Sequence, residues 1–255
     1  DFRINGASIF TSATNTYTTS TLNDGDIVTV VVTSTAGCDG SSANITMDVY
    51  EPVTADAGAD QQLCDAVTFT LAGIAPTPAT ATGMWSFVGA DNGAVIDDPS
   101  SANSSITGLP AGSSVTLRWS LTNGACSSTD DVTLTNLETP PTASAGGPQT
   151  LCNTSTFTLA GNVPAPGTGL WTIDAGTATI TNTALPTTTI TGVPIGSSVT
   201  LRWTISNGPC STSDVVVITN SAMPTTALAG GDQELCSSGN FTLAANAPVT
   251  GTGQW

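Results

Sequence analysis

Cysteine is the residue type whose chemistry is easiest to define in this chain. Six cysteines are present, whereas histidine and lysine are absent and the cations are three arginines. Histidine and lysine supply the usual general base, triad base and Schiff-base nitrogen, so we expect no catalytic residue and no enzyme activity. No Cys-x-x-Cys pair is present, which disfavours a zinc site. We therefore predict that the cysteines form disulfides in an exported protein.

Acidic side chains are the second group with a defined chemistry. The chain carries 19 Asp and Glu residues and a formal net charge of −16, which would repel nucleic acid and anionic membranes. Carboxylate clusters could bind calcium near domain junctions. They lie at Asp24 and Asp26, Asp56 and Asp60, Asp97-Asp98 and Asp130-Asp131. Asp56 is replaced by Ser144 and Leu228 in the later copies, although a calcium site needed at each junction should recur in each copy. We therefore expect no cofactor. We interpret the acids as a solvated surface that opposes aggregation.

An internal repeat of 84–88 residues organises the elements that carry these side chains. The stretch GSSVTLRW at 112–119 returns unchanged at 196–203, and FTLAG at 69–73 returns at 157–161. Each of the cysteines at 64, 126 and 152 has a counterpart one repeat later. Such self-similarity is typical of a tandem array of equivalent domains.

Four segments are expected from the period. They are a first complete copy at 52–139, a second copy at 140–223, the start of a third copy at 224–255, and residues 1–51. Residues 1–51 differ in sequence from the copies, but their last part has a pattern similar to the end of a copy. We interpret them as the C-terminal half of a related sandwich. The junctions are short and contain proline, which favours stiff linkers.

Each copy has the pattern of an antiparallel β-sandwich. Residues 115–121 and 199–205 alternate apolar and polar side chains with a period of two, which indicates strands with one buried face. An Asn-Gly pair follows each of these strands, at 123–124 and 207–208, and indicates a hairpin. Further strands are expected at 27–33, 45–50, 69–73, 84–88, 104–107, 132–135 and 215–219. The sequence therefore predicts an all-β fold.

The copies are also expected to form an elongated rod. Each unit should contact only its neighbours, as in other tandem repeats. A sandwich with strands of about seven residues is roughly 35–40 Å long. Three such lengths stacked end to end would measure on the order of 100 Å or more.

Two disulfide pairings fit the spacing. Within copies, Cys64 would bond Cys126 and Cys152 would bond Cys210, which closes loops of 62 and 58 residues. Between copies, all six cysteines would be used in pairs that are 26 residues apart: 38–64, 126–152 and 210–236. We favour the pairing within copies, because a cysteine before the second strand and one at the last hairpin can meet inside one sandwich.

Two ion pairs are expected on the outer faces of the hairpins. Arg118 precedes Asp130 by 12 residues, and Arg202 precedes Asp214 by the same distance. The hairpin should place each arginine opposite or diagonal to its aspartate. An exposed pair of this kind contributes at most about 1 kcal/mol.

Four tryptophans could stack on sugars, but their positions favour a different role. They lie on the apolar faces of alternating strands: Trp85, Trp119, Trp171 and Trp203. We therefore predict that they are buried core residues.

Several sequence motifs resemble a known repeat family. They are ADAGADQQLC at 55–64, TGMW at 82–85, GSSVTLRW at 112–119 and NGACSSTDDVTLT at 123–135, with FRINGA at 2–7 and LNDGDIVTVVVTS at 22–34. They resemble the immunoglobulin-like and PKD-like repeats of giant surface proteins of gliding and other type IX-secreting Bacteroidota. The resemblance covers nearly the whole chain. It implies secretion, a cell-surface location and an adhesive role of the SprB gliding-motility kind, and it transfers no catalytic residue.

These observations favour a structural spacer segment of a large secreted adhesin or filament. The expected partners are neighbouring repeats of the same chain, with surface polysaccharide or other cells bound by distal regions. The alternatives are a carbohydrate-binding or spacer region of a secreted polysaccharide-acting enzyme, and a self-associating surface-layer or fibre subunit.

Overall fold

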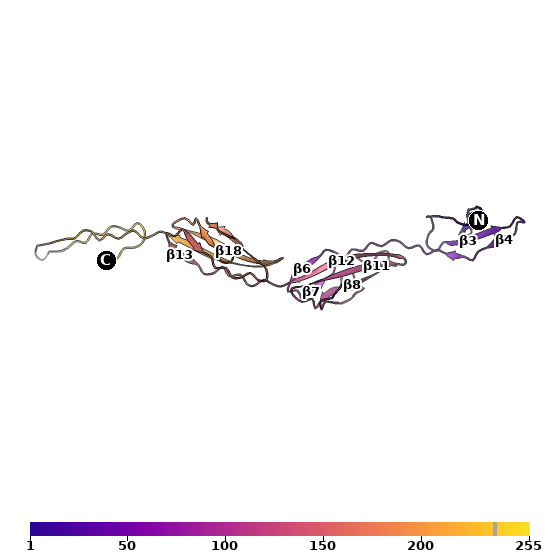
Figure 1. The fold of residues 1–255 in the computed structure, drawn as a ribbon, viewed down its shortest axis with the longest axis horizontal. Coiled ribbons are helices and arrows are strands. Elements are labelled where there is room, and N and C mark those ends of the chain that lie inside the picture. The colour runs from indigo at the N-terminus through magenta and orange to yellow at the C-terminus, as the bar shows by residue number, and fades with distance from the viewer. Residues whose placement is uncertain (237–238) are drawn as a thin grey trace. The chain divides into compact units, whose positions relative to one another are not determined.

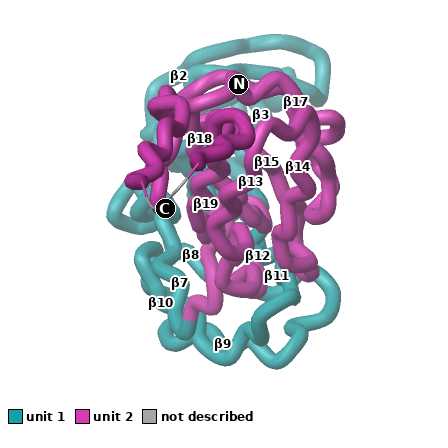
Figure 2. Tube along the Cα trace, turned by 90° about the vertical axis from the view of Figure 1, so that its left-hand side faces the viewer, with its two compact units in different colours: residues 1–61, 67–135 teal, residues 62–66, 136–255 magenta. Residues whose placement is uncertain are grey.

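The computed structural model describes residues 1–236 and 239–255, which form β-strands and connecting loops (Figure 1). None of these described residues belongs to a helix that could span a membrane. Their contacts divide the chain into two compact units (Figure 2). The first unit holds residues 1–61 and 67–135, and the second holds 62–66 and 136–255. The expected segment boundaries stay a prediction, and residues 237 and 238 of the last segment lie outside the described residues.

The first unit begins with a sheet of five short strands. Its members are β1 (Phe2–Ile4), β2 (Ala7–Phe10), β3 (Ile27–Thr33), β4 (Asp39–Ser41) and β5 (Ile45–Thr46). The order is β2-β1-β3-β4, and β5 also pairs with β3. The predicted strand at 27–33 is confirmed, while the one predicted at 45–50 is limited to two residues.

The first copy of the repeat contributes two further sheets. The strands are β6 (Gln61–Cys64), β7 (Thr68–Thr70), β8 (Thr82–Phe87), β9 (Val95–Ile96), β10 (Ser105–Thr107), β11 (Ser113–Asn123) and β12 (Cys126–Leu137). One sheet has the order β6-β12-β11-β8, and the other has the order β7-β10-β9.

The second copy repeats this arrangement inside the second unit. Its strands are β13 (Gln149–Cys152), β14 (Thr156–Thr158), β15 (Thr168–Ala175), β16 (Thr179–Ile180), β17 (Thr189–Thr191), β18 (Ser197–Asn207) and β19 (Cys210–Ser221). The sheets have the orders β13-β19-β18-β15 and β14-β17-β16. The pairing of β13 with β19 is parallel, whereas β15, β18 and β19 pair antiparallel.

A pair of tryptophans fills the core of each copy. Trp171 lies opposite Trp203 in the register of β15 and β18, and their ring centroids are 5.0 Å apart. Trp85 and Trp119 form the equivalent pair at 4.8 Å. All four side chains are buried, which confirms the sequence prediction. A Cβ atom on Gly169 would overlap the ring of Trp203, so this strand position accepts only glycine without a shift of the indole.

The predicted hairpins are also present. Asn207 pairs with Cys210 across a two-residue loop, and Gly208 at its first position has a φ of 59°. The first copy has Gly124 at the same place with a φ of 56°. The asparagine of each Asn-Gly pair therefore flanks the loop, which leaves its side chain for another contact.

Candidate functional site at the repeat junction

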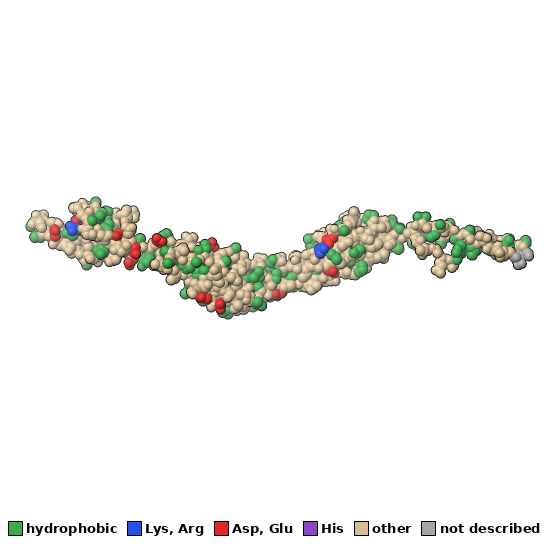
Figure 3. All heavy atoms as spheres, turned by 180° about the vertical axis from the view of Figure 1, so that it is seen from behind, with side chains coloured by type: hydrophobic (Ala, Val, Ile, Leu, Met, Phe, Trp, Pro, Cys, Tyr) green, Lys and Arg blue, Asp and Glu red, His purple; other side chains and the backbone are tan. Residues whose placement is uncertain are grey.

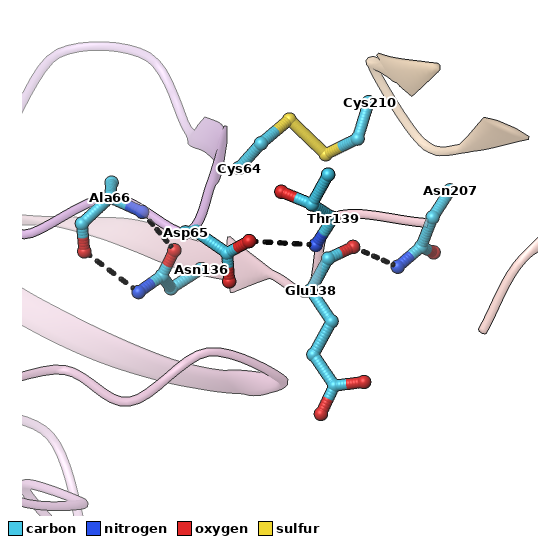
Figure 4. Close-up of a disulfide and its surroundings, with 8 residues drawn as sticks. All are labelled: Cys64, Asp65, Ala66, Asn136, Glu138, Thr139, Asn207 and Cys210. Carbon is cyan, nitrogen blue, oxygen red and sulfur yellow. Dashed lines mark hydrogen bonds between the residues drawn. A yellow bond between two sulfur atoms is a disulfide. The ribbon is translucent and has the colours of Figure 1, made fainter. Parts of the chain in front are cut away.

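A disulfide joins Cys64 to Cys210 (Figure 4). Cys64 ends β6 in the first sequence copy, and Cys210 begins β19 in the second, 146 residues later. The Cα atoms are 5.8 Å apart, within the range that a disulfide requires. The bond therefore connects two successive copies of the repeat covalently, and both cysteines belong to the second compact unit.

The pairing that we favoured from the sequence is wrong. Cys64 does not bond Cys126, Cys152 does not bond Cys210, and the pairs 26 residues apart are not formed either. The cause is the parallel pairing of β13 with β19, which places Cys152 beside Ser221. Cys210 lies eleven residues earlier on β19, roughly 35 Å along the strand. The two cysteines of one copy thus lie at opposite ends of it, and Cys126 and Cys152 carry free thiols.

The backbone next to the disulfide is tied to the end of β12. The Asp65 N–H donates to the carbonyl of Leu137 at 2.9 Å. The carboxylate of Asp65 accepts a hydrogen bond from the Thr139 N–H at 3.1 Å. Asn136 exchanges two hydrogen bonds with the backbone of Ala66, at 2.7 and 2.9 Å (Figure 4). The strand that carries Cys64 is therefore fixed to the linker that leads into the second copy.

The hairpin of the second copy holds the same linker. The side-chain amide of Asn207 donates to the Glu138 carbonyl at 2.9 Å (Figure 4). Gly208 lies under Leu137, because a Cβ atom there would be 2.6 Å from a methyl carbon of that side chain. We call this arrangement the linker clamp.

The first unit contains a second linker clamp with the same parts. The side-chain amide of Asn123 donates to the Glu51 carbonyl at 2.9 Å. The ring of Tyr50 occupies the place where Gly124 would carry a Cβ atom. The thiol of Cys126 lies 3.6 Å from the Tyr50 carbonyl and donates to it. The clamp therefore recurs at the linkers that precede the first and the second copy, whereas the disulfide is formed at the second of these two linkers.

The predicted ion pair of Arg118 with Asp130 is wrong, because Arg118 binds Asp131. Its guanidinium makes two hydrogen bonds to that carboxylate, at 2.7 and 2.8 Å. Asp130 accepts a hydrogen bond from the Ala57 N–H instead, at 2.8 Å. Neighbouring residues of a strand face opposite sides of the sheet, which separates the roles of these two aspartates.

The predicted pair of Arg202 with Asp214 is wrong for the same reason. Asp214 lies opposite Trp203 and therefore on the inner face, where it accepts a hydrogen bond from the Ala145 N–H at 2.8 Å. Arg202 lies on the outer face opposite Val215 and binds Asp174 of β15 at 2.7 Å.

Arg118 lowers the pKa of the Asp131 carboxyl below its ordinary value, first through the hydrogen bond and then through its charge. A lowered folded-state pKa means that the pair stabilises the fold above about pH 4 and stops doing so as the pH falls through the folded pKa. We expect Arg118→Met to raise the pKa of Asp131 in a carboxyl NMR titration, while Arg202→Met leaves it unchanged. An unshifted Asp131 in Arg118→Met would contradict this assignment.

Three further aspartates of the candidate calcium clusters accept hydrogen bonds from backbone N–H groups. Asp60 accepts from the Thr133 N–H at 2.8 Å, Asp24 from Val49 at 3.1 Å and Asp56 from Gly58 at 2.8 Å. No group of three or more His, Cys, Asp or Glu side chains able to hold a metal ion occurs within residues 1–236 and 239–255. The contacts that are observed assign these acids to turns and strand ends.

Comparison with known proteins bears on the fold. No protein-family model and no curated protein matches the chain. Extracellular domains 3–5 of Drosophila OTK match with a TM-score of 0.52 and 15% identity, covering 77% of this chain and 71% of that one. Immunoglobulin domains 1–5 of Sidekick-1 match with a TM-score of 0.47 and 14% identity, covering 90% and 55%. The titin I-band fragment I67–I69 matches with a TM-score of 0.40 and 16% identity, covering 78% and 76%. The chain thus has an all-β fold of tandem immunoglobulin-like domains.

Proposed function

We propose that this chain is a non-catalytic structural spacer segment of a large secreted cell-surface adhesin or filament. The observation that carries the proposal is the covalent bond between successive copies at Cys64 and Cys210. A spacer must transmit tension from copy to copy without letting the copies separate. A disulfide across the junction does this, and the linker clamps limit the freedom of each linker.

The surface and the cores agree with a spacer. On the face drawn in Figure 3, acidic side chains are more numerous than basic ones, which keeps a long chain soluble and discourages self-association. The tryptophans of both complete copies lie in the cores and offer no platform for stacking a sugar. This burial speaks against the alternative of a carbohydrate-binding region in a polysaccharide-acting enzyme.

The finer parts of the proposal rest on sequence motifs. The resemblance to Bacteroidota surface repeats supports an exported protein that is displayed on the cell surface, of the SprB gliding-motility kind and secreted by the type IX route. The disulfide supports an oxidising, extracellular location. Neighbouring repeats would be the direct partners, and distal regions would bind polysaccharide or other cells.

Small-angle X-ray scattering tests the spacer role through molecular dimensions. We expect a maximum dimension on the order of 100 Å or more, as estimated from strand length. A compact chain of this length would have a radius of gyration of only about 18 Å. The double variant Asn123→Ala and Asn207→Ala removes both clamp amides and should broaden the distribution of dimensions while the sheets stay folded. A wild-type radius of gyration near the compact value would contradict the proposal.

A further inference from the structure

The disulfide between Cys64 and Cys210 decides which residues carry tension when the chain is pulled from its two ends. Tension follows the shortest covalent route, which leaves the first copy at Cys64 and enters β19 at Cys210. Residues 65–209 lie inside the closed loop. This loop contains β7 to β18, and therefore most of both cores, and it carries no tension while the bond is intact.

In the first copy, tension passes along residues 53–64, here called the entry segment. The segment ends in β6, which is the neighbour of β12 in the sheet. Before β6, the Ala55 N–H donates to the Ser128 hydroxyl at 3.0 Å. The Ala57 N–H donates to the Asp130 carboxylate at 2.8 Å. Side chains of β12 therefore hold the part of the entry segment that precedes the regular strand.

The entry segment is already extended along β12. Its contacts with Ser128 and Asp130, and that of Asp60 with the Thr133 N–H, each join residues that are 73 apart in the sequence. A constant separation means that the entry segment runs parallel to β12 and advances as far per residue. A β-strand rises about 3.3 Å per residue, and a fully stretched chain reaches about 3.6 Å. Stretching the entry segment therefore adds little length.

In the second copy, tension follows β19 (Cys210–Ser221) from its first residue to its last. β19 lies between β13 and β18 in the sheet and pairs with β18 along nearly its whole length. Near its start, the Thr212 hydroxyl accepts a hydrogen bond from the Ala143 N–H at 3.0 Å. The Asp214 carboxylate accepts one from the Ala145 N–H at 2.8 Å. The second copy is thus also crossed along an extended strand that neighbours hold on both sides.

We propose that the entry segment, the disulfide and β19 form a load path that makes the two copies nearly inextensible. Force accelerates unfolding only when unfolding lengthens the route that carries the force, because the work done equals the force times the gain in length. Unfolding of either core adds little length to this route, since both of its strands are already extended. The mechanical response of the oxidised chain is therefore independent of the stability of the cores.

This inference deepens the proposed spacer role and rests on it. A spacer with such a load path keeps its length even while one of its copies is unfolded. Without the disulfide, tension would pass through residues 65–209, and each copy would lengthen greatly on unfolding. The bond thus converts two extensible domains into a covering around a covalent cable.

Force spectroscopy of the full 255-residue chain tests the load path with a core variant inside the loop. Ile205→Val removes one methyl group from a fully buried side chain of β18, a change that buried sites commonly tolerate. In the oxidised wild type we expect no unfolding step from either copy, and Ile205→Val should leave the trace unchanged. Any step from the sheet of residues 1–51 is common to all variants.

Cys64→Ser provides the matched background in which tension enters the loop. Both copies should then unfold in steps that together release about 500 Å, and Ile205→Val should lower the force of one of these steps. Chemical denaturation should show that Ile205→Val lowers stability in both backgrounds. An unchanged trace in the oxidised chain then reflects the route of tension and not an unaffected core.

Peptide mapping of the pulled sample establishes that Cys64 and Cys210 are bonded. Long unfolding steps from the copies in a bonded chain, at a force that Ile205→Val lowers, would overturn the inference, because the cores would then carry load. The spacer role would stand in that case, since scattering tests it separately through the dimensions of the relaxed chain.

Discussion

Trp171→Ala is expected to lower the free energy of unfolding of the second copy by about 3–5 kcal/mol, the usual cost of removing a buried tryptophan. The side chain is 1% exposed, packs against Trp203 with the two rings tilted, and donates its indole N–H to the Pro186 carbonyl at 3.2 Å. Chemical denaturation followed by hydrogen exchange of β15 and β18 measures the loss.

Trp255→Ala is the matched control, because Trp255 stands 84 residues after Trp171 but is 70% exposed. We expect it to change stability by less than about 0.5 kcal/mol, as most surface substitutions do. Equal losses in both variants would show that the side chain of Trp255 is packed as Trp171 is, and would contradict the difference in burial between the two residues.

Much of the fold could be predicted from the alternation of side chains. Val115, Leu117, Trp119 and Leu121 were expected on one buried face, and they are at most 3% exposed. The repeat of this pattern at 199–205 predicted β18 with equal success. The very short strands escaped prediction, because two residues at 95–96 or 179–180 carry no measurable period.

The predictions of the two ion pairs failed because the expected strand register was wrong by one residue. A shift of one residue moves a side chain to the other face of the sheet. The Asn207–Cys210 pair fixes the partner of Arg202 as residue 215, which is a valine. The same count from the equivalent loop of the first copy gives Asp131 as the partner of Arg118. Asp131 could therefore have been identified from the sequence as the partner of Arg118. Asp174 becomes the partner of Arg202 only through the pairing of β15 with β18.

The junction could not be predicted because its contacts join residues that lie far apart in the sequence, both within one copy and between copies. No local pattern indicates that β13 pairs parallel with β19, and this pairing decides which end of the copy holds Cys152. The Asn-Gly motif was interpreted as a turn signal alone. In each copy the asparagine of this motif also donates a hydrogen bond to a backbone carbonyl of the linker, at Glu51 in the first copy and at Glu138 in the second. This contact is seen only once the structure shows where the linker lies.

Removing the disulfide between Cys64 and Cys210 is expected to have the second large effect. The closed loop spans 146 residues, for which loop entropy predicts a stabilisation of about 5 kcal/mol. Loss of the disulfide should also change the length of the chain under tension. An intact disulfide keeps the residues between Cys64 and Cys210 from being extended. Without it, about 500 Å of extended chain should be released, at roughly 3.6 Å per residue.

Single-molecule force spectroscopy of the chain, pulled from its two ends, tests the spacer account most directly. Cys64→Ser and Cys210→Ser, each alone, should lengthen the fully unfolded chain by about 500 Å, as should reduction of the wild type. Cys126→Ser and Cys152→Ser should leave the length unchanged, because their thiols are free. An increase of only about 200 Å in Cys64→Ser, matched by the same increase in Cys126→Ser, would contradict a bond between successive copies.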